Sequence, residues 1–281
     1  MSGFEALRWI NLEPIAACNL RCPHCSRDGS ARPQGAMELD LFARLLAQVP
    51  EGCEVRLFLS GEPFLDARLA ERVRLCAAAG RRSLVHTNGT HCTTERVRAV
   101  LAAGLSQVSV SIDGGSLDEY ARMRPGSGTR PAWGGLAEIL HWRDRLRAPT
   151  RVILQSIRPH PAPLDVMAEL GELAERCDEV YVRHPHNWAQ MASVDGSAPA
   201  SYGEVCSFLR VSQSVQADGL VVPCCAVLNG ERIIGDAKVE SLRAIWERES
   251  VAIARAQERG EYVPVCSTCE RYGRAAEGVA V

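Results

Sequence analysis

Two hydrophobic periods alternate along the first two thirds of the chain. Short runs rich in Val, Ile and Leu have the length of buried strands, and they alternate with longer segments whose hydrophobic residues recur every three or four positions. The predicted strands are 8–16, 55–61, 82–88, 107–114, 150–156 and 178–184, and the predicted helices are 37–49, 66–79, 93–103, 133–146 and 163–176. The first of these helices has a single hydrophobic stripe, formed by Leu39, Phe42, Leu45, Leu46 and Val49.

Strands that alternate with helices of this length indicate βαβ units and a parallel sheet. Six such units are too few for a closed eightfold barrel, so the expected fold class is α/β, with a partial (β/α)6 TIM-like barrel over residues 1–190. In barrels of this kind the functional residues lie at the C-terminal ends of the strands. Polar motifs at those positions are therefore the first candidates for a functional site.

The composition changes after Trp188. Residues 191–205 are rich in Ala, Ser, Gly and Pro and have no hydrophobic period, which predicts a linker. The segment "RVSQSVQADGLVVPCC" then predicts a β-hairpin that turns at Asp218–Gly219. Ser241 is the expected N-cap of a helix that ends near Glu258. These elements predict a small α+β domain over 206–275.

The charge pattern narrows the class of partner. The formal net charge is −2 and charges of both signs are mixed along the chain, which gives no electrostatic case for a nucleic-acid partner. The N-terminal sequence lacks the apolar region of a secretory signal, and the longest apolar run is too short to span a bilayer. We expect a cytoplasmic protein with no membrane partner.

Twelve cysteines are many for a chain of 281 residues. A disulfide framework is one explanation, but it is typical of small secreted domains, and the spacing favours thiolate ligands for a soft metal or an iron–sulfur cluster. Seven cysteines form two such sets: Cys18, Cys22 and Cys25, then Cys206, Cys224, Cys266 and Cys269. Four others lie in or beside apolar segments and are interpreted as small buried hydrophobic residues: Cys53, Cys76, Cys92 and Cys177.

The first set lies in "CNLRCPHC", directly after the first predicted strand, and no fourth cysteine follows nearby. Clusters of four irons normally have four thiolate ligands, so three thiolates would leave one iron open to an external ligand. S-adenosylmethionine fits such a position through its amine and carboxylate. One electron into its sulfonium would then release a 5′-deoxyadenosyl radical. A zinc knuckle or a ferredoxin-like loop is the alternative.

With this motif and the βα units in place, the sequence resembles the radical S-adenosylmethionine (SAM) enzymes over nearly its whole length. "SGEP", "HTNG" and "SVSIDG" end the second, third and fourth predicted strands, as the family's cofactor-binding segments do. Ser60 stands where the family has glycine, so the match of this segment is inexact. The SAM-binding residues that the resemblance implies are Ser60, Gly61, Glu62, Asn88, Ser111, Asp113 and Arg124.

The second cysteine set resembles the twitch extension, which is a shortened form of the SPASM domain. "DGLVVPCC", "SLRAIW" and "CSTC" match its pattern in order. The resemblance implies an auxiliary [4Fe–4S] cluster held by four thiolates: Cys206, Cys224, Cys266 and Cys269. Cys225 could replace Cys224 as a ligand, and a structural zinc site with four cysteines is the alternative.

Among such enzymes the chain is most similar to the aminocyclitol dehydrogenases. This resemblance implies hydrogen abstraction from an unactivated C–H bond and two-electron oxidation of a secondary alcohol in a sugar or aminocyclitol intermediate of natural-product biosynthesis. The auxiliary cluster would be the electron acceptor, and flavodoxin or ferredoxin an external one-electron reductant.

Two other classes stay open. The first is radical modification of a ribosomally made peptide, by epimerisation or by formation of a thioether or other cross-link. Such enzymes often carry an N-terminal leader-recognition domain, which we do not expect here because about ten residues precede the first predicted strand. The second is a non-enzymatic electron carrier, which would not need the polar residues at the strand ends.

Catalytic candidates are polar residues that the strand ends direct into the mouth of the barrel. A base near the substrate would remove the alcohol proton, and an arginine would anchor the substrate or stabilise an alkoxide. The predicted catalytic residues are Arg158, His184 and His186. Further candidates for substrate contact are Glu13, His86, Gln155, Asn187 and Trp188.

Overall fold

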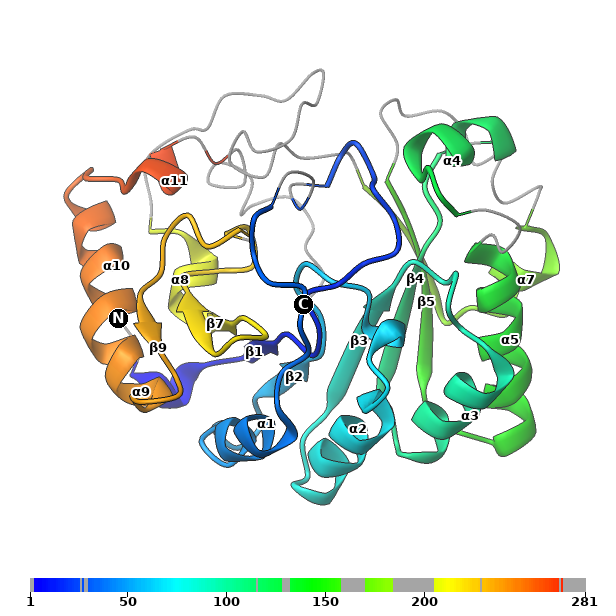
Figure 1. Cartoon of the computed structure of the whole chain (residues 1–281), viewed down its shortest axis with the longest axis horizontal. Coiled ribbons are helices and arrows are strands. Elements are labelled where there is room, and N and C mark those ends of the chain that lie inside the picture. Colours follow the sequence, from blue (N-terminus) through cyan, green and yellow to red (C-terminus); the bar gives the residue numbers. More distant parts are fainter. Residues whose placement is uncertain are drawn as a thin grey trace.

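A single sheet runs through the part of the chain that the computed structural model describes (Figure 1). The described residues are 3–25, 27, 30–114, 116–127, 132–157, 170–183, 205–227, 229–267 and 269. In these ranges the sheet has nine strands in the order β6-β5-β4-β3-β2-β1-β7-β8-β9. The strands are β1 (Trp9–Leu12), β2 (Glu54–Arg56), β3 (Ser83–Thr87), β4 (Gln107–Ser111), β5 (Arg151–Ile157), β6 (Glu179–Arg183), β7 (Ser212–Val215), β8 (Leu220–Val222) and β9 (Gly235–Asp236).

The first six strands pair in parallel and in chain order, as the alternating periods predicted. Helices follow the strands, and α1 packs on α2, α2 on α3 and α3 on α5. These helices are α1 (Leu39–Leu46), α2 (Leu69–Ala78), α3 (Thr94–Ala102), α4 (Leu117–Met123), α5 (Ala132–Leu146) and α7 (Glu172–Glu175), with 3-10 turns η1 (Phe4–Ala6) and η2 (Pro63–Leu65). The α/β class with a partial barrel is confirmed.

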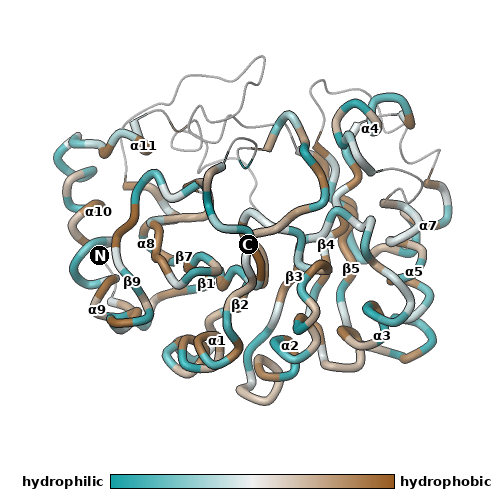
Figure 2. Tube along the Cα trace, in the orientation of Figure 1, coloured by the Kyte–Doolittle hydropathy of each residue, from teal (hydrophilic) through white to brown (hydrophobic). Residues whose placement is uncertain are grey.

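The core lies between the strands and the inner faces of these helices. Five successive strands each place an aliphatic residue with almost no exposed surface in it: Ile10, Val55, Val85, Val108 and Val152. Along α3 and α5 hydrophilic and hydrophobic residues alternate, as expected for helices that bury one face (Figure 2). The predicted helix at 163–176 is represented by α7 alone, and half of that segment, 163–169, lies outside the described residues. Helix α4 was not predicted from the hydrophobic pattern.

The C-terminal segment extends the same sheet rather than forming a separate one. Strand β7 pairs in parallel with β1, and β7 and β8 form the predicted antiparallel hairpin, whose turn contains Gly219 at a φ of 88°. All four residues of β7 are buried, including the polar Ser212, Gln213 and Ser214, and so are Val221 and Val222 of β8. Pairing with β1 therefore places the C-terminal region next to the loop that follows β1 (Figure 1).

Short helices complete the C-terminal region. They are α8 (Ser207–Val211), α9 (Leu242–Ile245), the π-helical turn η3 (Trp246–Ser250), α10 (Val251–Glu258) and α11 (Pro264–Ser267). The hydroxyl of Ser241 accepts a hydrogen bond from the backbone N–H of Ala244, so the predicted N-cap is confirmed. The predicted linker lies almost wholly outside the described residues, and the limits of the two domains stay a prediction.

The cysteines outside the two sets behave as expected of hydrophobic residues. All twelve cysteines lie in the described residues and none of them forms a disulfide, and Cys53, Cys76 and Cys92 are buried. Cys177 is half-buried and packs against the core. In the described residues, no helix is long and apolar enough to cross a membrane.

One helix contact gives a matched pair of predictions at adjacent glycines. A Cβ at Gly135 in α5 would lie 2.0 Å from the carbonyl oxygen of Gly89, whereas a Cβ at Gly134 would meet nothing within 4 Å. Gly135→Ala should therefore destabilise the fold by about 1–3 kcal/mol through overpacking. Gly134→Ala should stabilise it by up to about 1 kcal/mol, since alanine favours the helix. Urea unfolding of the two variants checks this, and equal effects would contradict the close approach of α5 to Gly89.

Candidate functional site

The three-cysteine motif lies on the loop that leaves the C-terminal end of β1. Cys22 is buried, Cys18 and Cys25 are half-buried, and the backbone N–H of Cys25 donates to the carbonyl of Cys22 at 3.0 Å. The next cysteine along the chain, Cys53, directly precedes β2. It therefore lies at the N-terminal end of the parallel strands, opposite to the cysteine loop. The loop therefore presents three thiols at the functional end of the barrel, as predicted.

The three thiols interact electrostatically. The pKa of Cys22 is raised to about 12, mainly by burial; Arg124 opposes this rise, and Cys25, Asp113 and Cys18 add to it. Burial also raises the pKa of Cys18, with a smaller contribution from Cys25 in the same direction. Each thiol must lose its proton to become a metal ligand, so iron binding here would release protons.

Three thiols are a set of ligands that suits an iron–sulfur cluster. Among the described residues, no three His, Cys, Asp or Glu side chains are arranged to hold one metal ion. In a four-iron cube each thiolate binds a different iron, so its ligands are spread around the cube and do not converge on one point. Three thiols on one loop supply three of the four positions.

Glu62 anchors this loop from the side of β3. Its carboxylate has almost no exposed surface and accepts hydrogen bonds from Thr87 Oγ1 and the backbone N–H of Asn88, both at 2.7 Å. Burial raises the pKa of Glu62, and these donors lower it. The amide of Asn88 in turn donates to Asn19 Oδ1 at 3.0 Å and lies 3.8 Å from Cys18 Sγ. "SGEP" and "HTNG", which end neighbouring strands, are thus joined and reach the first cysteine.

Asp113 anchors the loop from the side of β4. Its buried carboxylate accepts from Arg124 Nε at 2.7 Å and from the backbone N–H of Ile157 at 2.9 Å, and it lies 3.2 Å from His24 Nε2. Burial raises the pKa of Asp113, but Arg124 and His24 outweigh it and hold that pKa well below its usual range. Because His24 immediately precedes Cys25, this ion pair fixes the third cysteine against β4 and β5.

Gly61 is required by the close approach of the same loop. A Cβ at this position would lie 1.9 Å from the carbonyl oxygen of Ile15 and 2.8 Å from that of Ala17. The backbone N–H of Glu62 also donates to Ala17 at 2.8 Å. The "SGEP" segment therefore lies directly against the backbone that leads into Cys18.

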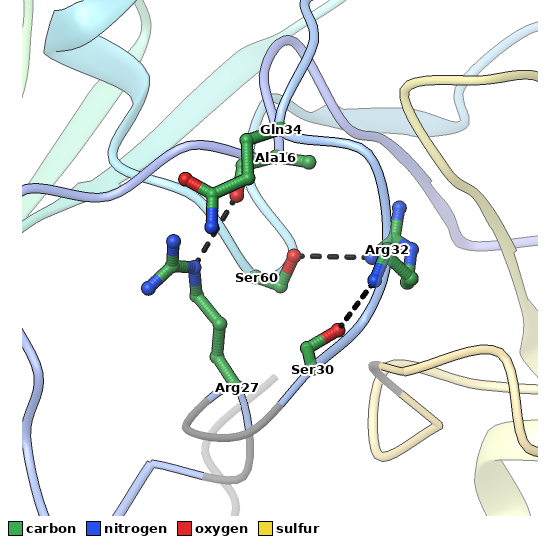
Figure 3. Close-up of a pocket in the computed structure, with 6 residues that line it drawn as sticks. All are labelled: Ala16, Arg27, Ser30, Arg32, Gln34 and Ser60. Atoms are coloured by element: carbon green, nitrogen blue, oxygen red, sulfur yellow. Dashed lines mark hydrogen bonds between the residues drawn. The ribbon is translucent and has the colours of Figure 1, made fainter.

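A small polar pocket lies where the cysteine loop meets "SGEP" (Figure 3). Arg32 Nη1 donates to Ser60 Oγ at 3.1 Å, the backbone N–H of Arg32 donates to Ser30, and Arg27 Nε donates to the carbonyl of Ala16 at 3.3 Å. A larger and more apolar pocket lies beyond Asp113 and is lined by Ile112, Asp113, Ser116, Leu117, Tyr120, Trp133 and Leu170.

The C-terminal thiols lie close enough to interact electrostatically, and Cys224 and Cys225 follow β8. Burial raises the pKa of Cys206, Cys224 and Cys266, that of Cys266 to about 12, and charges on neighbouring cysteines raise each further. The charge of Cys269 raises the pKa of Cys206 and Cys266, and the charge of Cys225 raises the pKa of Cys206 and Cys224. The structure therefore brings the four predicted ligands together with Cys225 as a fifth thiol.

The remaining predicted site residues divide into two groups. Ser111 and Gln155 are buried neighbours across β4 and β5, and His86 stacks on Phe58 with ring centroids 3.9 Å apart. The predicted catalytic residues and two substrate contacts lie outside the described residues: Arg158, His184, His186, Asn187 and Trp188.

Sequence reasoning missed three residues that hold the cysteine loop. They are Asn19, His24 and Arg32, which contact Asn88, Asp113 and the Ser60 segment respectively. Their only signal in the sequence is their position within or just after "CNLRCPHC". No local rule predicts which distant carboxylate or amide each would meet.

Family models match both parts of the chain. Residues 12–141 match the Radical SAM superfamily, and residues 206–270 match the iron–sulfur cluster-binding domain called SPASM. The protein belongs to the radical SAM superfamily and carries a SPASM-type C-terminal domain. Membership implies SAM and a [4Fe–4S] cluster as cofactors, with an auxiliary iron–sulfur cluster in the C-terminal domain, and the thiol sets described above fit both clusters.

Two kinds of curated relative are similar to part of the chain. An AdoMet-dependent heme synthase from Methanosarcina barkeri is 32% identical over 175 residues, which cover 60% of this chain and 50% of the relative. A GTP 3′,8-cyclase from Synechococcus sp. (strain CC9902) is 33% identical over 134 residues, which cover 46% of this chain and 39% of the relative. The chain thus spans half or less of the length of these relatives.

Solved structures share the fold over more of the chain. BtrN in complex with AdoMet and 2-DOIA has a TM-score of 0.63 at 18% identity, with 98% of this chain and 94% of that chain covered. SuiB from Streptococcus suis bound to the precursor peptide SuiA has a TM-score of 0.70 at 11% identity, with 87% and 65% covered. At such identities the likeness concerns the fold alone.

Proposed function

We propose that this protein is a radical SAM oxidoreductase that oxidises a secondary alcohol of a sugar or aminocyclitol intermediate by two electrons. When bound, its cofactors supply a 5′-deoxyadenosyl radical at the β1 loop and an electron acceptor at the C-terminal thiols. The observation that carries the proposal is that both thiol sets lie next to one continuous sheet. Three thiols follow β1, and Cys224 and Cys225 of the C-terminal set follow β8, in the hairpin whose first strand β7 pairs with β1.

The choice of an alcohol substrate is supported by likeness over the whole chain. BtrN has the same fold along nearly its full length and was solved with AdoMet and 2-DOIA. Its chain also matches this one in extent, since 94% of it is covered. The heme synthase and cyclase relatives cover a smaller share of this chain, so they support the radical SAM class more than the reaction.

In this proposal different residues at the strand ends bind different parts of SAM. The Ser60–Glu62 segment would hold the amine of SAM, Ser111 and Asp113 the ribose, and Arg124 the carboxylate. Both Glu62 and Asp113 already accept several protein hydrogen bonds, so they would act mainly by fixing the loop that carries the cysteines.

The substrate itself would meet the predicted catalytic residues. A histidine, His184 or His186, would take the alcohol proton, which is most effective when the pKa of the base lies near the working pH. Arg158 would anchor the substrate through its permanently charged guanidinium. An external one-electron reductant such as flavodoxin or ferredoxin would complete the system.

Anaerobic turnover tests the proposal. The reconstituted and reduced protein is mixed with SAM and a panel of aminocyclitols and sugar alcohols, and 5′-deoxyadenosine and carbonyl products are measured by mass spectrometry. We expect one 5′-deoxyadenosine per ketone, and deuterium at the oxidised carbon should appear in the 5′-deoxyadenosine. Recovery of SAM unchanged after ketone formation would contradict the proposal.

A second candidate is radical modification of a ribosomally made peptide. It is favoured by the fold of SuiB, which was solved with its precursor peptide, although only 65% of that chain is covered. Deuterium transfer to 5′-deoxyadenosine from a labelled peptide, with no transfer from any labelled alcohol, would favour this candidate.

A further inference from the structure

Glu13 is a buried carboxylate at the centre of the site. It follows β1 directly, has no exposed surface, and accepts four hydrogen bonds. One oxygen accepts from the backbone N–H of Ser60 at 3.0 Å and from its hydroxyl at 2.5 Å. The other accepts from Arg32 Nη2 at 2.6 Å and from the backbone N–H of Ala217 at 2.8 Å. Both oxygens are therefore directed to protein donors.

These donors come from three separate segments. Ser60 belongs to "SGEP" after β2, Arg32 lies on the loop that carries the cysteines, and Ala217 lies in the turn between β7 and β8. The backbone N–H of Glu13 also donates to the carbonyl of Val215 at 3.0 Å, which holds it against the end of β7. One carboxylate thus joins the cysteine loop, the "SGEP" segment and the C-terminal hairpin.

Ser60 gives this arrangement a contact that glycine could not. Its hydroxyl accepts from Arg32 Nη1 at 3.1 Å (Figure 3) and donates to Glu13, so it bridges the acid and the guanidinium. Arg32 is mostly buried beside a fully buried Glu13, where charge-assisted hydrogen bonds are stronger than at an exposed pair. The serine at the position that is glycine in the family's motif is therefore part of a closed Glu13–Ser60–Arg32 triad.

We propose that Glu13, Ser60 and Arg32 are positioning residues that set the "SGEP" segment in register with the cysteine loop, so that SAM is bound correctly relative to the cluster. The proposal rests on the proposed SAM-binding function. The side chains of the triad are directed at one another, and the triad acts through the backbone of Gly61 and Glu62, which lies against Ile15 and Ala17 just before Cys18.

The test uses the full-length reconstituted protein and the electron paramagnetic resonance spectrum of the reduced cluster, titrated with SAM. Ser60→Gly removes the bridging hydroxyl but keeps the backbone donor, and Arg32→Met removes the guanidinium. Each variant should raise the SAM concentration for half-maximal spectral change by about tenfold, the cost typical of losing one charged or bridging hydrogen bond.

The double variant is the sharper measurement. Because both side chains act through the Glu13 carboxylate, Ser60→Gly with Arg32→Met should weaken SAM binding little more than the worse single variant does. Two independent effects would instead multiply. Glu71→Gln, which removes an exposed carboxylate paired with Arg68, is the control and should leave the titration unchanged.

The possible failures are distinguishable. If the wild-type spectrum does not respond to SAM, the proposed function is wrong. If it responds and the variants titrate like wild type, or their effects multiply, the triad does not position the segment. A fall in iron content per chain in Ser60→Gly would also overturn the proposal, because the triad would then support cluster assembly rather than SAM binding.

Discussion

Replacing Cys22 with alanine should reduce formation of 5′-deoxyadenosine by at least about a hundredfold. Loss of groups outside the ligand shell typically costs up to that factor at metal sites, and Cys22 is predicted to be a ligand itself. Its thiol is buried on the loop after β1 and interacts with Cys18 and Cys25. The measurement is 5′-deoxyadenosine released per chain from SAM under reducing, anaerobic conditions, together with iron content.

Cys76→Ala is the matched control. Cys76 is buried like Cys22, and more completely, but it lies in helix α2 within the hydrophobic core, away from the cysteine loop. This substitution should cost some stability but leave iron content and 5′-deoxyadenosine formation near wild type. If the two variants lost activity equally, the thiol of Cys22 would matter as core packing and not as a ligand. The iron lost in Cys22→Ala should come from the N-terminal cluster only, because the C-terminal thiols are intact.

Replacing Asp113 with asparagine should cost about 3–5 kcal/mol of folding free energy, since it leaves Arg124 as a buried charge without a partner. Asp113 is fully buried and its carboxylate contacts Arg124, His24 and the backbone of Ile157. Urea unfolding under anaerobic conditions, followed by fluorescence, measures the loss. SAM binding should weaken in the same variant, because His24 and hence Cys25 lose an anchor.

The contribution of the Asp113 ion pair to folding stability depends on pH. Burial raises the pKa of Asp113, but its cationic neighbours lower this pKa by more than burial raises it. The pKa of Asp113 is therefore lower in the folded state than in the unfolded state. The ion pair then stabilises the fold fully above the unfolded pKa and loses this contribution only as the pH falls into the acid range. The part of the Asp113→Asn cost that comes from Arg124, which stays charged, should therefore be the same at about pH 6 and about pH 8.

Asp144→Asn provides the control for Asp113→Asn. Asp144 pairs with Arg143 and Arg176 near the surface, with half of its side chain exposed. Solvent and salt screen such pairs, so the cost should stay below about 1 kcal/mol. A similar loss in both variants would mean that the Asp113–Arg124 pair is no more important than a surface ion pair.

Local patterns in the sequence were enough to predict the strands and most helices of the barrel. A buried parallel strand needs a short aliphatic run and a covering helix needs one apolar stripe, and both are properties of neighbouring residues. Strand β3 and helix α3 differ from their predicted ranges by only one or two residues at each end. Helix α4 was missed because its short segment has only one buried residue, Tyr120.

The chemistry of the cysteine loop was also encoded locally. The spacing of Cys18, Cys22 and Cys25 within eight residues keeps the three thiols near one another in any compact loop. The turn at Asp218–Gly219 and the N-cap at Ser241 are similarly fixed by the conformational preferences of single residues, and the structure confirms both.

The tertiary structure alone decided which distant groups hold that loop. Glu13, Glu62 and Asp113 lie far apart in the sequence, yet each is buried at a strand end and reaches the loop through Arg32, Asn88 and His24. The pairing of β7 with β1, which brings the C-terminal thiols to the edge of the barrel, is likewise a contact between segments about 200 residues apart. The periodicity of the sequence predicts each helix and strand, because the conformation of a helix or strand depends on residues that are neighbours along the chain. The partners of a buried charge depend on how the elements pack, because burial makes an unpaired charge costly only once the strands have met.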